Sequence, residues 1–225
     1  RGGTPCPRQC RRRLCLMASS ARGPSGAAPF PPDWLKTAKL PITVVPAGKV
    51  LHRIHRTHLD PVFYGPGAGG DPIYRFDSSS GRFGVLYIGH SFAGAFVETI
   101  LRNPQRLMVS EREIVSRSVT ELVSRTDLRM VTMLGSGLQA LGTDNSISTG
   151  PYEPCGAWAD ALWDHPEEPD GIAYMSRHDP GEVCFAVFER GTIAFDVEAT
   201  HPLATKQRDV AALLDRYGKS LAIDM

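Results

Sequence analysis

The sequence predicts an α+β domain with a mixed, largely antiparallel sheet and flanking helices. Two observations favour this class. Strand-like apolar runs and amphipathic helical segments are both present, and they follow one another without the regular β-α-β alternation of a parallel sheet. The hydrophobic fraction of 42% over 225 residues is ample for the core of such a domain.

The chain divides by composition near residue 33. Residues 1–16 hold five arginines and no acid, and residues 17–33 are rich in Ser, Gly, Ala and Pro. We interpret residues 1–33 as a disordered leader, of which residues 1–16 are expected to lie upstream of a start at Met17, and residues 34–225 as a single domain. The formal net charge of the whole chain is +1, so the chain without residues 1–16 has a net charge of −4. This charge gives no indication of direct nucleic-acid binding.

The first half of this domain is expected to contain three regular elements joined by a long loop. We expect a short helix near residues 31–35, a strand over 50–55 and a strand over 84–89. Residues 60–72 hold three prolines and four glycines and predict a loop. Ser91 is a suitable N-cap for a helix that runs to about Arg102, before Asn103-Pro104.

The second half is expected to alternate less regularly. Strands are predicted over 112–124, 128–133, 171–175, 183–189 and 192–197. A helical turn is predicted over 138–141, with helices over 155–163 and 205–217. Residues 219–224 are expected to form a final edge strand.

The sequence gives little support for a membrane protein, a disulfide-bonded protein or a metal-binding protein. No run of 18 or more apolar residues is present, so no membrane span is expected. Five cysteines without a framework indicate reduced thiols in a cytoplasmic protein. Cys6, Cys10 and Cys15 lack a fourth ligand at a familiar spacing, and the histidines 52, 55 and 58 do not share one strand face, so no metal is expected.

Five polar side chains lie on otherwise apolar segments: Arg53, Arg75, Tyr87, Glu98 and Ser176. Such groups usually have a partner or a function. Arg75 lies in Tyr74-Arg-Phe-Asp. Three further segments carry the other four, namely Leu51-His-Arg-Ile, Val85-Leu-Tyr-Ile-Gly through Glu98, and Asp170-Gly-Ile-Ala-Tyr-Met-Ser-Arg with the strand at 183–188. Together these segments resemble the RES domain family, whose members are toxins of bacterial toxin–antitoxin pairs with an ADP-ribosyltransferase-like fold.

The resemblance implies that NAD is the substrate and that no other cofactor is needed. It implies Glu98 and Arg53 as catalytic residues and Arg75, Tyr87 and Ser176 as substrate-binding residues. Family members split NAD with phosphate, hydrolyse it or transfer ADP-ribose to a protein. The implied partner is an antitoxin with a DNA-binding domain, and a homo-oligomer is compatible with the sequence.

Some alternatives stay open at this stage. Glu98 taken alone resembles an ordinary solvated helical glutamate, and Arg56 competes with Arg53 because only one of the two faces inward. Asp77 stands where the family usually has asparagine, which places a negative charge near expected phosphates. That departure supports a non-catalytic NAD-binding module as an alternative, beside protein ADP-ribosylation.

Overall fold

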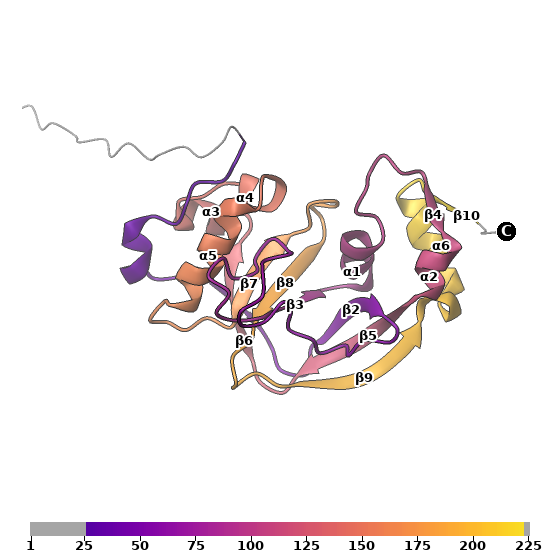
Figure 1. Cartoon of the computed structure of the whole chain (residues 1–225), viewed down its shortest axis with the longest axis horizontal. Coiled ribbons are helices and arrows are strands. Elements are labelled where there is room, and N and C mark those ends of the chain that lie inside the picture. The colour runs from indigo at the N-terminus through magenta and orange to yellow at the C-terminus, as the bar shows by residue number, and fades with distance from the viewer. Residues whose placement is uncertain (1–25, 223–225) are drawn as a thin grey trace, which may run out of the picture.

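The computed structural model describes residues 26–222 of the chain, and a curved eight-stranded sheet forms its centre (Figure 1). The strands, in spatial order, are β1 (Ile42–Val45), β6 (Leu128–Met133), β7 (Gly171–Met175), β8 (Val183–Phe188), β3 (Val85–Gly89), β2 (Val50–Arg56), β5 (Arg117–Ser124) and β9 (Phe195–Pro202). Every neighbouring pair is antiparallel except β6 with β7. The predicted mixed, largely antiparallel sheet is therefore confirmed.

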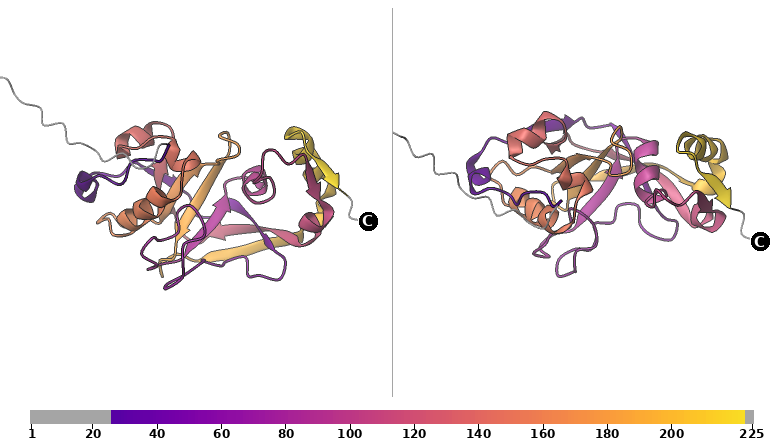
Figure 2. Two further views of the ribbon diagram at one scale, coloured as in Figure 1. Left: turned by 45° about the horizontal axis from the view of Figure 1, so that its top comes forward. Right: turned by 90° about the horizontal axis from the view of Figure 1, so that it is seen from above.

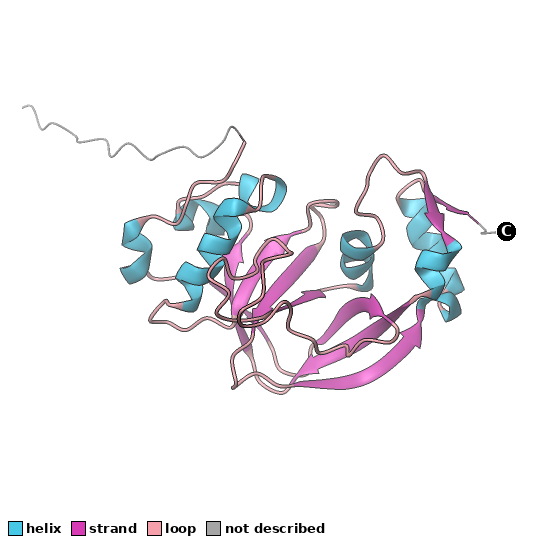
Figure 3. Ribbon diagram, in the orientation of Figure 1, coloured by secondary structure: helices cyan, strands magenta, loops and turns pink. Residues whose placement is uncertain are grey.

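Helices flank this sheet in three groups (Figures 1 and 3). Beside β6, β7 and β8 lie α3 (Ser136–Leu141), α4 (Ser146–Thr149), α5 (Glu153–Trp163) and the 3₁₀ helix Asp33–Thr37. The short α1 (Phe92–Thr99) packs on β2 and β3. The far end carries α2 (Glu111–Val115), the 3₁₀ helix Leu203–Thr205, α6 (Gln207–Arg216) and a two-stranded parallel sheet of β4 (Met108–Ser110) and β10 (Ser220–Ala222). Figure 2 shows α1 between the two outer groups.

Two hydrophobic clusters fill the space between the sheet and these helices. Trp158 and Leu162 of α5 pack with Phe76, Phe83 and Phe188 in the first. The second cluster joins α1 to α2 and α6 through residues that include Phe96, Ile114 and Leu213. Each fully buried large apolar side chain contributes about 1.5–3 kcal/mol to folding. The site described below lies between these two packed regions.

The structure corrects several element boundaries. The strand predicted over 112–124 is wrong in its first part, because residues 111–115 form α2 and the strand begins at Arg117. α1 ends at Thr99 rather than near Arg102, and the strand predicted over 192–197 runs instead from Phe195 to Pro202. β1, β4 and α4 were not predicted. β10 confirms the final strand, but it pairs with β4 outside the main sheet.

The beginning of the domain also differs from the expectation. Ala28 is fully buried, and the Trp158 indole Nε1 donates a hydrogen bond to the Pro29 carbonyl at 2.8 Å. Residues 28 and 29 therefore belong to the packed domain, which begins before residue 34. Residues 1–25 of the predicted leader, with Cys6, Cys10 and Cys15, lie outside the described residues.

The described part of the chain contains no helix of the length and apolarity that crossing a membrane requires. Cys155 and Cys184 are buried free thiols. Within residues 26–222 no group of three or more His, Cys, Asp or Glu side chains is arranged to hold a metal ion.

Candidate functional site

A cavity of about 870 Å³ opens between α1, the strands β2 and β3, and the connection from α4 to α5. Four of the five predicted site residues line it, namely Arg53, Arg75, Tyr87 and Glu98. Ser176 is almost fully buried and contacts Glu98 from the protein side. The structure thus brings together residues from four distant segments.

Glu98 is carried into the cavity by α1. Ser91 caps this helix, since its side chain accepts a hydrogen bond from Gly94 N at 2.9 Å, as the sequence predicted. Gly89 lets the helix lie close to β3, because a Cβ atom there would come within 2.6 Å of Ala95 N. Ala95, Phe96 and Val97 are buried, which fixes the rotation of the helix and leaves Glu98 half-buried at the cavity wall.

The Glu98 carboxylate is held by two donors on the same oxygen. Ser176 Oγ donates to Glu98 Oε1 at 2.6 Å and Arg177 N donates to it at 2.9 Å. No donor among residues 26–222 reaches Oε2, so this oxygen can accept a hydrogen bond from a ligand. Fixing a carboxylate in this way prepares it to stabilise positive charge without reorganisation.

Ser176 has its own supports at the end of β7. Its Oγ accepts hydrogen bonds from the backbone N–H groups of His178 and Asp179 at 3.1 and 3.2 Å. The hydroxyl proton is therefore directed to Glu98. This geometry makes Ser176 a positioning residue for the carboxylate, while the substrate-binding role implied by the resemblance stays a prediction.

Arg53 lies on β2 with its side chain toward the cavity. Its Nη1 donates to the carbonyls of Pro61 and Phe63 at 3.0 and 2.9 Å, which ties the 60–72 loop to the sheet. Burial lowers the pKa of the Arg53 guanidinium to about 10, so the group stays charged at neutral pH. Arg56, the alternative to Arg53 as the inward-facing arginine, is exposed and also borders the cavity, farther along the strand.

Arg75 is more deeply buried than Arg53, the other arginine predicted for the site. It is 7% exposed, and its Nη1 donates to the carbonyls of Ile147 and Gly150 at 3.1 and 2.9 Å. The Tyr152 ring covers the guanidinium, with 4.5 Å between Cζ and the ring centroid. Nη2 has no hydrogen-bond partner within the described residues.

Tyr87 is half-buried at the cavity wall, and its hydroxyl is bonded to the fully buried Asp77. Tyr87 OH donates to Asp77 Oδ1 at 2.8 Å and accepts from Phe76 N at 2.9 Å. Asp77 Oδ2 accepts from the backbone N–H groups of Ile73 and Tyr74 at 2.9 and 2.7 Å. Burial raises the pKa of both side chains. Because Asp77 is 0% exposed, it does not present a negative charge to a ligand, which corrects the interpretation of this residue.

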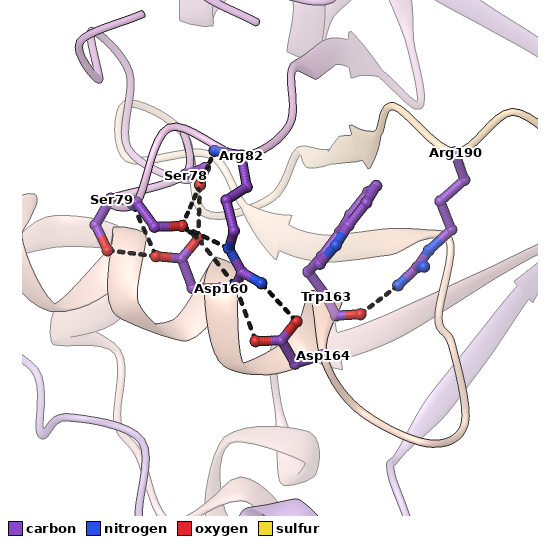
Figure 4. Close-up of polar contacts among 8 residues, drawn as sticks. Ser78, Ser79, Arg82, Asp160, Trp163, Asp164 and Arg190 are labelled. Carbon is purple, nitrogen blue, oxygen red and sulfur yellow. Dashed lines mark hydrogen bonds and ion pairs between the residues drawn. The ribbon is translucent and has the colours of Figure 1, made fainter. Parts of the chain in front are cut away.

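The segment that carries Arg75 and Asp77 is anchored on α5 (Figure 4). The Asp160 carboxylate accepts hydrogen bonds from the hydroxyls of Ser78, Ser79 and Ser80 and from Ser80 N, at 2.5–3.0 Å. One turn later, Asp164 forms a two-point ion pair with Arg82, at 2.8 Å for each bond. This anchor holds the loop in place just after the residues that face the cavity.

The sequence profile of the RES domain matches residues 50–210, which includes all five predicted site residues. The chain belongs to the RES domain family. Its matched region begins at β2 and ends within α6.

One curated relative and one solved structure are similar to this RES domain. The protein named Probable toxin y4kH, from Sinorhizobium fredii, is 42% identical over 60 residues. That alignment covers 27% of this chain and 46% of the relative, so less than half of the relative's length is matched. A chain in the crystal structure of the M. tuberculosis MbcT–MbcA toxin–antitoxin complex matches with a TM-score of 0.56 at 18% identity, covering 73% of this chain and 90% of that chain. The predicted α+β class is confirmed by the sheet and helices of this chain, and the structural match shows a fold shared with that chain.

The cavity of this RES domain is rich in positive charge. Two glutamates, Glu98 and Glu113, line it together with seven arginines, at positions 53, 56, 75, 102, 106, 117 and 177. Arg106 and Arg117 are paired with Glu113, at 3.4 and 3.1 Å. The remaining excess favours an anionic ligand, because guanidinium groups stay charged and bind phosphate through paired donors.

Aromatic residues that the sequence did not single out complete the RES domain cavity. Tyr74 lies edge-on to Tyr87, with ring centroids 5.4 Å apart, and Arg102 lies over the Tyr74 ring at 5.5 Å. Tyr152 stacks on Arg75. Tyr74 and Tyr152 lie in loops without hydrophobic periodicity, so no sequence pattern indicated that they would line the cavity. Their exposed rings offer stacking surfaces for a planar ligand group.

Proposed function

We propose that this chain is a toxin that cleaves the nicotinamide–ribose bond of NAD, with phosphate or water as acceptor. The observation that carries the proposal is the Glu98 carboxylate, fixed by Ser176 and Arg177 in a cavity whose lining includes several arginines and tyrosines. A dinucleotide combines two phosphates with planar bases and matches this combination of charge and aromatic surface. Membership of the RES domain family adds to the support.

The proposed chemistry needs one carboxylate and a bound leaving group. As the C–N bond breaks, nicotinamide departs with the electron pair and positive charge develops on the ribose ring, as in glycoside cleavage. Glu98 stabilises that charge through its free oxygen. A phosphate oxygen or a water oxygen then bonds to the anomeric carbon, giving ADP-ribose phosphate, or ADP-ribose with release of a proton.

The other side chains are assigned to binding and orientation. Arg53 and Arg75 hold the phosphates, and Tyr87 supports the cavity wall with its ring while its hydroxyl is used by Asp77 and Phe76. Because Asp77 is occupied in this internal network, the main argument for a non-catalytic module is removed. Protein ADP-ribosylation uses the same bond cleavage with a different acceptor, and it remains the second candidate.

The biological setting follows from the family. We propose that an antitoxin encoded with this protein neutralises it and carries a DNA-binding domain, and that the toxin acts on NAD in the cytoplasm. The names of the S. fredii relative and of the M. tuberculosis complex support this setting. Self-association of the toxin belongs to the same proposal and is testable by sedimentation.

The direct test is nicotinamide release from NAD by the purified protein, in phosphate buffer and in phosphate-free buffer. We expect release by the wild type and a decrease of at least about 100-fold for Glu98→Gln, which keeps shape but removes charge. Glu198→Gln is the matched control, because Glu198 is exposed on β9 and does not line the cavity. No release by the wild type, or equal release by Glu98→Gln, would refute the proposal; label moving to a protein would favour ADP-ribosylation.

A further inference from the structure

Two fully covered polar atoms at the cavity have no hydrogen-bond partner within residues 26–222. They are Arg75 Nη2 and Ser148 Oγ, on residues that are 7% and 2% exposed. Both residues line the cavity. Buried polar groups in native proteins are almost always paired, so an unpaired donor at a cavity indicates where a bound group completes the hydrogen bonding.

The two atoms belong to one local arrangement. Arg75 Nη1 donates to the carbonyl of Ile147, which precedes Ser148 in α4, and to the carbonyl of Gly150, which follows this helix. The C-terminal end of the short helix therefore lies against the guanidinium. Its carbonyls occupy one nitrogen of Arg75, while the other nitrogen and the Ser148 hydroxyl are left for a different partner.

The charge of this arrangement selects the chemistry of that partner. Arg75 contacts two carbonyls, the Cys155 sulfur at 3.6 Å and the Tyr152 ring, none of which is an anion. Burial raises the pKa of the Cys155 thiol, so it stays protonated. No carboxylate of the described residues lies within the 4.0 Å ion-pair distance of Arg75. A buried guanidinium without an anionic partner favours binding of an anion.

We propose that Arg75 Nη2 and Ser148 Oγ form a subsite for a phosphoryl oxygen. The proposal deepens the NAD-cleaving function and rests on it. Both atoms donate, and a phosphoryl oxygen has the lone pairs to accept from two donors. The ring of Tyr152, 42% exposed, covers the guanidinium and turns aside as the ligand enters. The phosphoryl group comes either from the pyrophosphate of NAD or from a free phosphate acceptor.

The test compares Ser148→Ala with a matched control variant, both made in a parent protein that does not cleave NAD. Glu98→Gln is the parent protein, and calorimetry measures its binding of NAD and, separately, of inorganic phosphate. Thr143→Val is the control, because Thr143 Oγ1 is likewise buried and unpartnered but does not line the cavity. Thermal unfolding of both variants is measured alongside.

We expect Ser148→Ala to weaken binding by about tenfold, the usual effect of losing a hydrogen bond to a charged group. Thr143→Val leaves binding unchanged, and neither variant unfolds at a lower temperature, because each removes an unpaired hydroxyl. Weaker binding of NAD alone assigns the subsite to the pyrophosphate, and weaker binding of phosphate alone assigns it to the acceptor.

Dissociation constants within twofold of the parent for both ligands, or no binding of either ligand by the parent, would overturn the subsite. These results are separate from the test of the proposed function. Absence of nicotinamide release by the wild type refutes NAD cleavage even where the phosphate subsite is confirmed by titration with inorganic phosphate.

Discussion

Ser176 Oγ donates a 2.6 Å hydrogen bond to Glu98 Oε1, joining residues 78 positions apart in the sequence. The serine is 2% exposed and is itself fixed by two backbone N–H groups. The carboxylate therefore meets a preoriented donor on one oxygen, and Glu98 lines the cavity. This relationship links the family's glutamate and serine in one physical unit.

Removal of this donor should slow the reaction more than it weakens substrate binding. For Ser176→Ala we expect a decrease in kcat of about 10- to 100-fold with KM changed less than threefold, because the hydroxyl orients the charge-stabilising group. Steady-state kinetics of nicotinamide release measures both constants. Ser116→Ala, on an exposed residue beyond α2, is the control, and an increase in KM with unchanged kcat would contradict the positioning role.

Asp77 should be replaceable by asparagine but not by alanine. Asp77→Ala removes three hydrogen bonds, to Tyr87 and to two backbone N–H groups, and is expected to lower the free energy of unfolding by about 2–4 kcal/mol. Asp77→Asn keeps an acceptor for the backbone and should cost about 1 kcal/mol while retaining activity. Urea denaturation with an activity assay checks both, and loss of activity in a stable Asp77→Asn variant would show a direct role for the charge.

Because the loop is anchored on α5 mainly through Asp160, replacing Asp160 and replacing Asp164 should lower the free energy of unfolding by unequal amounts. Asp160 is 15% exposed and accepts four hydrogen bonds, so Asp160→Ala should lower the free energy of unfolding by about 2–4 kcal/mol. Asp164 forms an exposed pair with Arg82, so Asp164→Ala should cost less than about 1 kcal/mol. Because the loop carries Arg75, the Asp160 variant should also raise KM for NAD several-fold; equal stabilities of the two variants would exclude the anchor.

The lowered pKa of Asp179 predicts how the free energy of unfolding changes at acidic pH. A hydrogen bond from Tyr217 OH at 2.7 Å, with smaller contributions from Gly181 N and the Arg216 guanidinium, lowers the pKa of this carboxyl below its usual value of 3.8. A lowered folded-state pKa means that the stabilisation is present above pH 3.8 and is lost as the pH falls through the folded value. Asp179→Asn should therefore be less stable than the wild type at pH 6, with a smaller difference at pH 3. Urea unfolding at both pH values measures it, and a constant difference would refute this linkage.

The sheet class, most of the strands and α1 could be predicted from the sequence alone, because period-two alternation, glycine borders and the Ser91 cap act over a few residues. The five polar positions stand out on apolar segments, and the resemblance of those segments to the RES domain implied the family. The sequence misplaced α2, whose apolar content resembles a strand at short range.

How those positions work together depends on contacts that exist only in the folded chain. Hydrogen bonds across 78 positions made Ser176 a support for Glu98, and burial turned Asp77 from a charge near the ligand into an internal acceptor. The unpaired atoms of Arg75 and Ser148 are likewise visible only when α4 is folded around the guanidinium. Local sequence sets backbone preference, whereas desolvation and partner geometry depend on segments that meet only in the folded chain.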